Sequence, residues 1–80
     1  MELGSNIKDL RKQKGLRQEQ LAEAMGVSTA AVSKWETNQS YPELTLLAEL
    51  ADFFEVSVDT LIGHNLSADR METLIAQMEK

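Results

Sequence analysis

The stretch at residues 18–36, QEQLAEAMGVSTAAVSKWE, decides the fold prediction. In its first half, Leu21, Ala22 and Met25 bring apolar side chains to one face of a short helix. Gly26 follows at the position where a helix commonly ends with a residue in the left-handed conformation. We therefore expect a short helix that stops at this glycine.

The second half of the stretch predicts another helix, at about residues 29–36, after a first helix at about 18–25. Ser28 is a good N-cap, because its hydroxyl oxygen can accept a hydrogen bond from an unpaired amide of the first turn. Val32 and Trp35 lie three positions apart and face inward. The remaining side chains are small or polar and leave an outer face with little bulk.

Two helices joined in this way meet the demands of a helix-turn-helix motif. The small Ala22 lets the helices cross closely, and Gly26, four positions later, suits a turn that needs a positive φ. The second helix of such a motif must expose small or polar side chains that approach base edges in the major groove of DNA. The residues that fit this role are Thr29, Ala30, Ser33 and Lys34.

The chain before the motif supplies one further helix. We expect residues 1–4 to be disordered or the remnant of an expression tag, and Ser5 to cap a helix that ends at Gly15. Ile7 and Leu10 face inward on this helix. The other faces carry basic side chains, which are Lys8, Arg11, Lys12 and Lys14.

Two helices are expected after the motif. The polar loop at residues 37–42 contains the only proline, which disfavours helix in the residue before it. A helix over about residues 43–54 follows, and a short helix begins at Ser57 or Asp59 and closes at Gly63. The expected core stripe of the longer helix is Leu44, Leu47, Leu50, Ala51 and Phe54.

Residues 64–80 carry a separate amphipathic pattern. Ser67 is a good N-cap, and the helix after it would present one apolar stripe, made of Met71, Leu74, Ile75 and Met78. This stripe either folds back on the two preceding helices or forms a dimer interface. We favour dimerisation, because nearby side chains outside the core stripe offer further apolar surface. These side chains are Leu46, Phe53 and Ile62.

Composition limits the classes of function. A chain of 80 residues is one small domain, and the absence of cysteine removes disulfides, thiolate metal sites and cysteine nucleophiles. The single histidine, His64, has no partner ligands, so we expect neither a metal site nor a cofactor. No catalytic Ser/His/Asp set or glycine-rich phosphate loop is recognisable, so no enzymatic activity is expected. No apolar run reaches the roughly 18 residues of a membrane span and no signal-peptide pattern opens the chain, so we expect a cytoplasmic protein.

The net charge of −5 argues against a nucleic-acid binder only if it is taken as a whole. Residues 1–42 hold six basic and five acidic side chains, whereas residues 43–80 hold two basic and eight acidic ones. This asymmetry predicts a polarised molecule whose acidic end is repelled by DNA and whose basic end is turned toward it.

With these motifs in place, residues 5–63, and above all LRKQKGLRQEQLAEAMGVSTAAVSKWE, resemble the Cro and phage-repressor (Xre-type) helix-turn-helix family. Its members are bacterial and phage transcription regulators. The resemblance implies an all-α fold, a five-helix lambda-repressor-like DNA-binding bundle in which helices two and three form the motif. The amphipathic helix of residues 64–80 lies outside that bundle as an addition.

The resemblance also implies roles for individual residues. Positions that face bases are Thr29, Ala30, Ser33 and Lys34. Positions that contact DNA phosphates are Arg11, Arg17, Gln18, Ser28, Asn38 and Ser40. Arg11 also matches one half of an ion pair with Glu36, and Ser28 is a helix cap first and a DNA contact second. Only Lys34 can reach a guanine by itself, so direct readout of base sequence is expected to be thin.

The function implied is a sequence-specific transcriptional regulator of bacterial or phage origin, most simply a repressor. It would bind an inverted-repeat operator in double-stranded DNA as a homodimer, through the helix at residues 29–36, with no membrane partner. The alternative is a DNA-binding antitoxin or a protein-interaction module whose C-terminal helix captures another protein. Deleting residues 66–80 separates these two interpretations.

Overall fold

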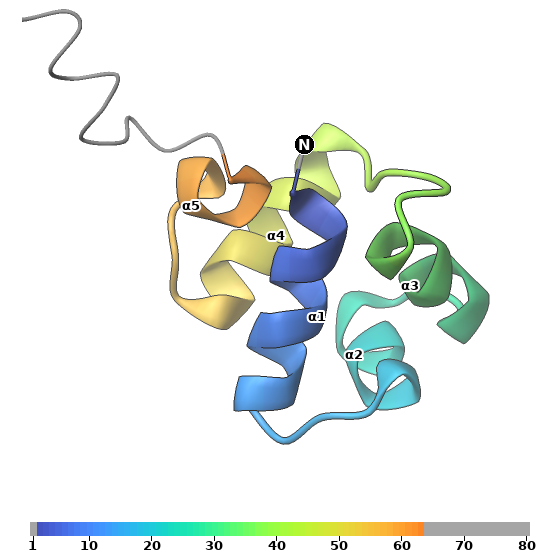
Figure 1. Ribbon diagram of the computed structural model, residues 1–80. Coiled ribbons are helices and arrows are strands. Elements are labelled where there is room, and N and C mark those ends of the chain that lie inside the picture. The colour runs from blue at the N-terminus through green and yellow to red at the C-terminus, as the bar shows by residue number, and fades with distance from the viewer. Residues whose placement is uncertain (1, 64–80) are drawn as a thin grey trace, which may run out of the picture.

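The computed structural model describes residues 2–63, which form five α-helices and no strand (Figure 1). The helices are α1 (Leu3–Gln13), α2 (Gln18–Met25), α3 (Thr29–Glu36), α4 (Leu44–Phe54) and α5 (Val58–Ile62). α1 runs through the middle of the bundle, with α2 and α3 on one side and α4 and α5 on the other (Figure 1). The all-α bundle predicted from sequence is confirmed. The apolar stripe predicted in the tail lies outside the described residues.

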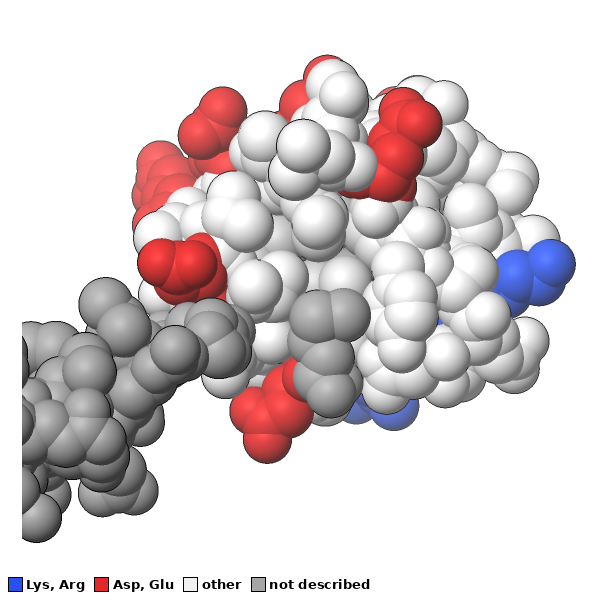
Figure 2. Space-filling model, turned by 90° about the horizontal axis from the view of Figure 1, so that it is seen from above, with Lys and Arg blue, Asp and Glu red and all other residues white. Residues whose placement is uncertain are grey.

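Charge is divided between the two sides of this bundle. Residues 43–63, which hold α4 and α5, contain five acidic side chains and neither lysine nor arginine. Seen from above, acidic side chains are spread over the left and upper parts of the surface and also reach the lower edge, and basic side chains appear at the right and lower edges (Figure 2). The right edge is the side of α3 in Figure 1. α4 and α5 therefore form an acidic side, whereas every lysine and arginine in residues 2–63 lies between positions 8 and 34, in α1, α3 or the loop between α1 and α2.

The helix-turn-helix segment has the boundaries that its sequence predicts. α2 and α3 cover the expected residues, and Gly26 between them has a φ of 70°. The Ser28 hydroxyl accepts a hydrogen bond of 3.1 Å from the amide of Ala31, and Ser57 caps α5 in the same way through Thr60, at 3.0 Å. Local capping signals are sufficient to define these three helices.

The N-terminal prediction is wrong. α1 begins at Leu3 rather than after a cap at Ser5, and Leu3 is only 1% exposed, so Leu3 and Gly4, which were assigned to a disordered end or tag, belong to the domain. Gly4 lies so close to the end of α3 that a Cβ built on it would be 2.6 Å from the carbonyl oxygen of Trp35. Gly4 therefore lets α1 approach the end of α3 closely.

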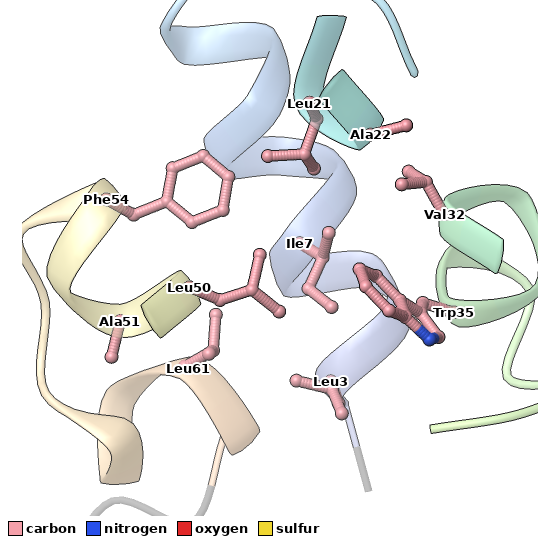
Figure 3. Packing of buried hydrophobic residues seen from close by; sticks show 10 residues of the cluster. All are labelled: Leu3, Ile7, Leu21, Ala22, Val32, Trp35, Leu50, Ala51, Phe54 and Leu61. Atoms are coloured by element: carbon pink, nitrogen blue, oxygen red, sulfur yellow. The ribbon is translucent and has the colours of Figure 1, made fainter. Parts of the chain in front are cut away.

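Each helix contributes to the core (Figure 3). Ile7 of α1 points to its centre, and the Trp35 ring of α3 and the Leu61 side chain of α5 point toward it from two sides. The side chain of Asn6 also ties α1 to α5, because its amide nitrogen donates to the carbonyl oxygen of Leu61 at 2.9 Å. The buried apolar residues are Leu3, Ile7, Leu21, Ala22, Val32, Trp35, Leu50, Ala51, Phe54 and Leu61.

The predicted core stripe of α4 needs a second correction. Leu44, assigned to the core, is 78% exposed, while Leu46 and Phe53, assigned to an outer surface, are half-buried against the core. Phe53 meets Phe54 edge-on at 5.2 Å between ring centroids, and the Lys14 ammonium lies 5.1 Å above its ring. Ile62 is also half-buried. The apolar stripe of α4 therefore starts one turn later than predicted, and the side chains offered for dimerisation are used largely within the monomer.

Candidate nucleic-acid interface

The outer face of α3 carries the four side chains predicted to face bases. Thr29, Ala30 and Lys34 are exposed and Ser33 is half-buried, whereas Val32 on the opposite face is fully buried. Their spacing along the helix places them on one side of it. The structure thus brings the predicted base-facing set together on a surface of small and polar groups.

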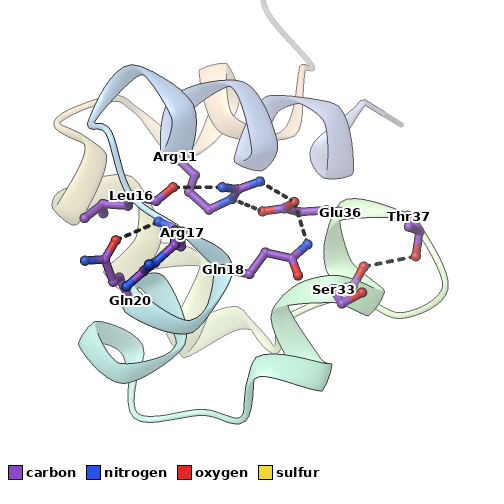
Figure 4. A network of polar contacts seen from close by, with 8 residues as sticks. All are labelled: Arg11, Leu16, Arg17, Gln18, Gln20, Ser33, Glu36 and Thr37. Carbon is purple, nitrogen blue, oxygen red and sulfur yellow. Dashed lines mark hydrogen bonds and ion pairs between the residues drawn. The ribbon is translucent and has the colours of Figure 1, made fainter.

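A buried polar network holds this face in place (Figure 4). The Arg11 guanidinium donates from Nε to Glu36 Oε2 at 2.6 Å and from Nη2 to Glu36 Oε1 at 3.1 Å. Its third nitrogen, Nη1, donates to the carbonyl oxygen of Leu16 at 2.8 Å. The predicted ion pair between α1 and the end of α3 is therefore confirmed, and its bidentate geometry is that of a strong pair.

This arrangement ties most of the Arg11 guanidinium to the fold, and the phosphate contact of Arg11 stays a prediction. The residue is only 9% exposed and each nitrogen of its guanidinium already has a partner within the domain. The hydrogen bond with Glu36 raises the pKa of Arg11, against an opposing effect of burial. Because a raised pKa keeps the guanidinium protonated, its contribution to stability is present at neutral pH and, as pH rises, is lost only in strongly alkaline solution.

Gln18 belongs to the same network, which the sequence does not reveal. Its Nε2 donates to Glu36 Oε1 at 3.0 Å, so the first residue of α2 is tied to the last residue of α3. Gln18 is half-buried at the start of α2, where the helix leaves backbone amides free for an anion. Gln18 is therefore partly exposed at the start of α2, and its side-chain amide is hydrogen-bonded to the buried Glu36 carboxylate.

The side chain of Arg17 is exposed and is held only by a weak surface ion pair. It is 74% exposed and its Nε lies 3.1 Å from a Glu19 carboxylate that is 63% exposed. A pair this exposed contributes roughly 0–1 kcal/mol, so a phosphate could replace it at little cost. The backbone amide of Arg17 donates to Gln20 Oε1 at 2.8 Å, which anchors the main chain while the side chain stays free to turn.

The loop after α3 is built around Asn38, which adopts a left-handed φ of 61°. Its Oδ1 accepts a hydrogen bond of 3.2 Å from the amide of Gly4, which leaves the amide nitrogen of Asn38 as a donor. The backbone amides of Gln39 and Ser40 both donate to the carbonyl oxygen of Lys34, at 2.8 and 3.3 Å. Asn38 and Ser40 thus lie in one hydrogen-bonded turn directly after α3.

Comparison with known proteins agrees with this geometry. Residues 7–61 match the model of the family described as Helix-turn-helix, the type of Cro and the phage repressors. The chain belongs to this family. The members of this family are DNA-binding transcription regulators.

Relatives within the family include activators and repressors. The chain is 43% identical over 63 residues to the transcriptional activator BcrR of Enterococcus faecalis, a match that covers 79% of this chain and 31% of BcrR. It is 33% identical over 79 residues to the transcriptional regulator SinR of Bacillus subtilis, which covers 98% of this chain and 71% of SinR. The chain therefore spans less than a third of the length of BcrR.

Among solved structures, the chain is similar to the c2 repressor of phage P22 in complex with a synthetic operator. The TM-score is 0.72 at 33% identity, and the match covers 76% of this chain and 92% of the repressor chain. This likeness confirms the lambda-repressor-like fold. None of the helices in residues 2–63 is long and apolar enough to cross a membrane.

Proposed function

We propose that this regulator binds double-stranded DNA as a homodimer, places α3 in the major groove and represses transcription from an inverted-repeat operator. The observation that carries the proposal is the exposed outer face of α3, which presents Thr29, Ala30 and Lys34. The likeness to an operator-bound repressor supports it. Two copies of α3 would enter successive major grooves about 34 Å apart.

Affinity would come chiefly from the DNA backbone. Besides Arg11, five residues around α3 are proposed phosphate contacts, and each lies at or beside the motif: Arg17, Gln18, Ser28, Asn38 and Ser40. Only Arg17 among them carries a charge. Binding should therefore depend on salt mainly through Arg17, Lys34 and the lysines of α1.

Base selectivity would rest on few groups. The Lys34 ammonium can bind guanine acceptors, and the Ala30 methyl can pack against the methyl of thymine. Thr29 and Ser33 add short hydroxyls that can donate or accept. Because no long amide or second arginine joins this set, the shape of the DNA is expected to carry part of the selection.

The dimer contact is proposed at the start of α4. Tyr41 is 53% exposed and Leu44 is 78% exposed, and both flank the buried Pro42. They replace Leu46, Phe53 and Ile62 as the proposed contact, because exposed apolar side chains that lie together favour association. In sedimentation, Leu44→Glu should change the protein from a dimer to a monomer. A dimer mass that is unchanged in this variant would contradict a contact at Leu44. Deleting residues 66–80 tests whether the stripe of the tail contributes.

Selection from random DNA sequences tests the proposed function. The wild-type chain should enrich an inverted repeat, and Lys34→Ala should cost about 1–3 kcal/mol on that site and relax one base position in each half-site. Lys8→Ala removes the same charge from an exposed position of α1 and should keep every base preference. Failure to enrich any sequence, or selection unchanged by Lys34→Ala, would contradict the proposed readout.

A further inference from the structure

We propose that Glu36 is a positioning residue for DNA binding, which holds the side-chain amide of Gln18 in the orientation that a phosphate requires. The proposal rests on the phosphate contact assigned to Gln18 above. Glu36 itself would touch no DNA, because its side chain is only 2% exposed. Its effect would pass through the hydrogen bond of 3.0 Å from Gln18 Nε2 to Glu36 Oε1.

The amide of Gln18 has one donor in use and one left over. Its nitrogen carries two N–H groups, and Glu36 accepts one of them. The second N–H has no partner in the part of the chain that the structure describes. Since an amide is planar, fixing the first N–H also fixes the direction of the second. A free glutamine would have to lose this rotational freedom when it binds, at a cost of about 0.5–1.5 kcal/mol.

The Glu36 carboxylate is fixed by hydrogen bonds, and its negative charge is offset by the Arg11 guanidinium. Glu36 Oε2 accepts from Arg11 Nε, and Oε1 accepts from both Arg11 Nη2 and Gln18 Nε2. An unpaired carboxylate this close to the DNA surface would repel a phosphate. The buried guanidinium offsets that charge, so Glu36 can serve as an anchor next to a site for an anion.

The network also fixes the phosphate contact relative to the bases. Gln18 is the first residue of α2 and Glu36 is the last residue of α3. Their hydrogen bond sets the position of the phosphate donor with respect to the helix that reads the groove. Arg11 extends the link to α1, so hydrogen bonds through Glu36 connect α1, α2 and α3 (Figure 4).

A double-mutant cycle in the full chain tests the inference. Affinity for a random-sequence DNA duplex is measured for the wild type, Gln18→Ala, Glu36→Met and the double variant, with folding of each checked by Trp35 fluorescence. Gln18→Ala should weaken binding about two- to tenfold in the wild-type background. It should have a smaller effect in the Glu36→Met background, where residue 36 has no oxygen to accept from Gln18 and the amide is no longer oriented. The negative charge lost in Glu36→Met is common to both arms of that comparison and cancels.

Two controls keep the result specific. Leu61→Ala removes a fully buried side chain of α5, outside the network, and Gln18→Ala should keep its full effect in that background. If Glu36→Met does not fold, Glu36→Asp takes its place, since it keeps the charge and shortens the reach. In the nuclear magnetic resonance spectrum of the free protein, the Gln18 side-chain amide should lie apart from other glutamines and join them in the Glu36 variant.

The outcomes separate failure of this inference from failure of the proposed function. An equal loss from Gln18→Ala in both backgrounds overturns the positioning role and leaves the phosphate contact standing. If Gln18→Ala weakens binding in neither background, although the Gln18 amide signal of the wild type is shifted, the positioning role and the phosphate contact are both overturned. Gln18 then contributes to the fold alone. A chain that binds no DNA in any variant, while the amide signal responds to Glu36, overturns the proposed function itself.

Discussion

Replacing Leu3 with alanine should destabilise the domain by about 3 kcal/mol. The side chain is 1% exposed and points into the core that also holds Trp35 and Leu61 (Figure 3). The substitution removes three carbon atoms, which at about 0.8 kcal/mol for each buried group amounts to roughly 2.4 kcal/mol. The cavity left behind raises the range for such leucines to about 2.7–5 kcal/mol, and Leu3 should lie at its lower end because the first turn of α1 can partly relax. A domain of this size has roughly 3–9 kcal/mol of stability in total, so the loss is large.

The measurement is urea unfolding followed by the fluorescence of Trp35, the only tryptophan, which is 4% exposed in the folded chain. Leu44→Ala makes the same chemical change at a position that is 78% exposed, and in dilute, monomeric protein it should change stability by less than about 0.5 kcal/mol. Equal midpoints for Leu3→Ala and the wild type would refute the reasoning. The first residues would then lie outside the cooperative domain, as an expression tag does.

Three further substitutions test single contacts. Gly4→Ala should destabilise by about 1–3 kcal/mol in thermal unfolding, because its Cβ would lie 2.6 Å from the carbonyl oxygen of Trp35; the stabilisation usual for this change inside a helix would contradict the close approach. Ser28→Ala removes the cap of α3 and should cost about 1 kcal/mol in urea unfolding, while an unchanged midpoint would mean that the bond to Ala31 contributes nothing. Arg11→Met leaves the Glu36 carboxylate buried without its ion-pair partner and should cost about 3–5 kcal/mol by the same assay; a loss below about 1 kcal/mol would show that water reaches the pair.

The motif was predictable because its signals are local. Gly26 and Ser28 set the end of α2 and the start of α3 through hydrogen bonds within a few residues of each, and the structure places both boundaries as expected. The ion pair of Arg11 with Glu36 joins residues 25 positions apart, and the family resemblance, rather than spacing, supplied it. The exposed face of α3 follows from helical periodicity once its inward residues are known.

Other features could not be predicted in this way. The exposure of Leu44 depends on where α4 first meets the rest of the bundle, and its own sequence reads equally well as a core position. The burial of Leu3 depends on how closely α1 approaches the end of α3. The bond of Gln18 to Glu36 depends on the angle between α2 and α3.

The sequence by itself determined that 18–36 would form two short helices at a tight turn, with a small and polar face on the second. It did so because caps, turns and periodicity act over one or two turns of helix. Only the tertiary structure decided how deeply Arg11 is buried and that Gln18 donates a hydrogen bond to Glu36. The physical reason is that a buried carboxylate must find its donors among whichever helices pack around it, and that packing is a property of the whole bundle.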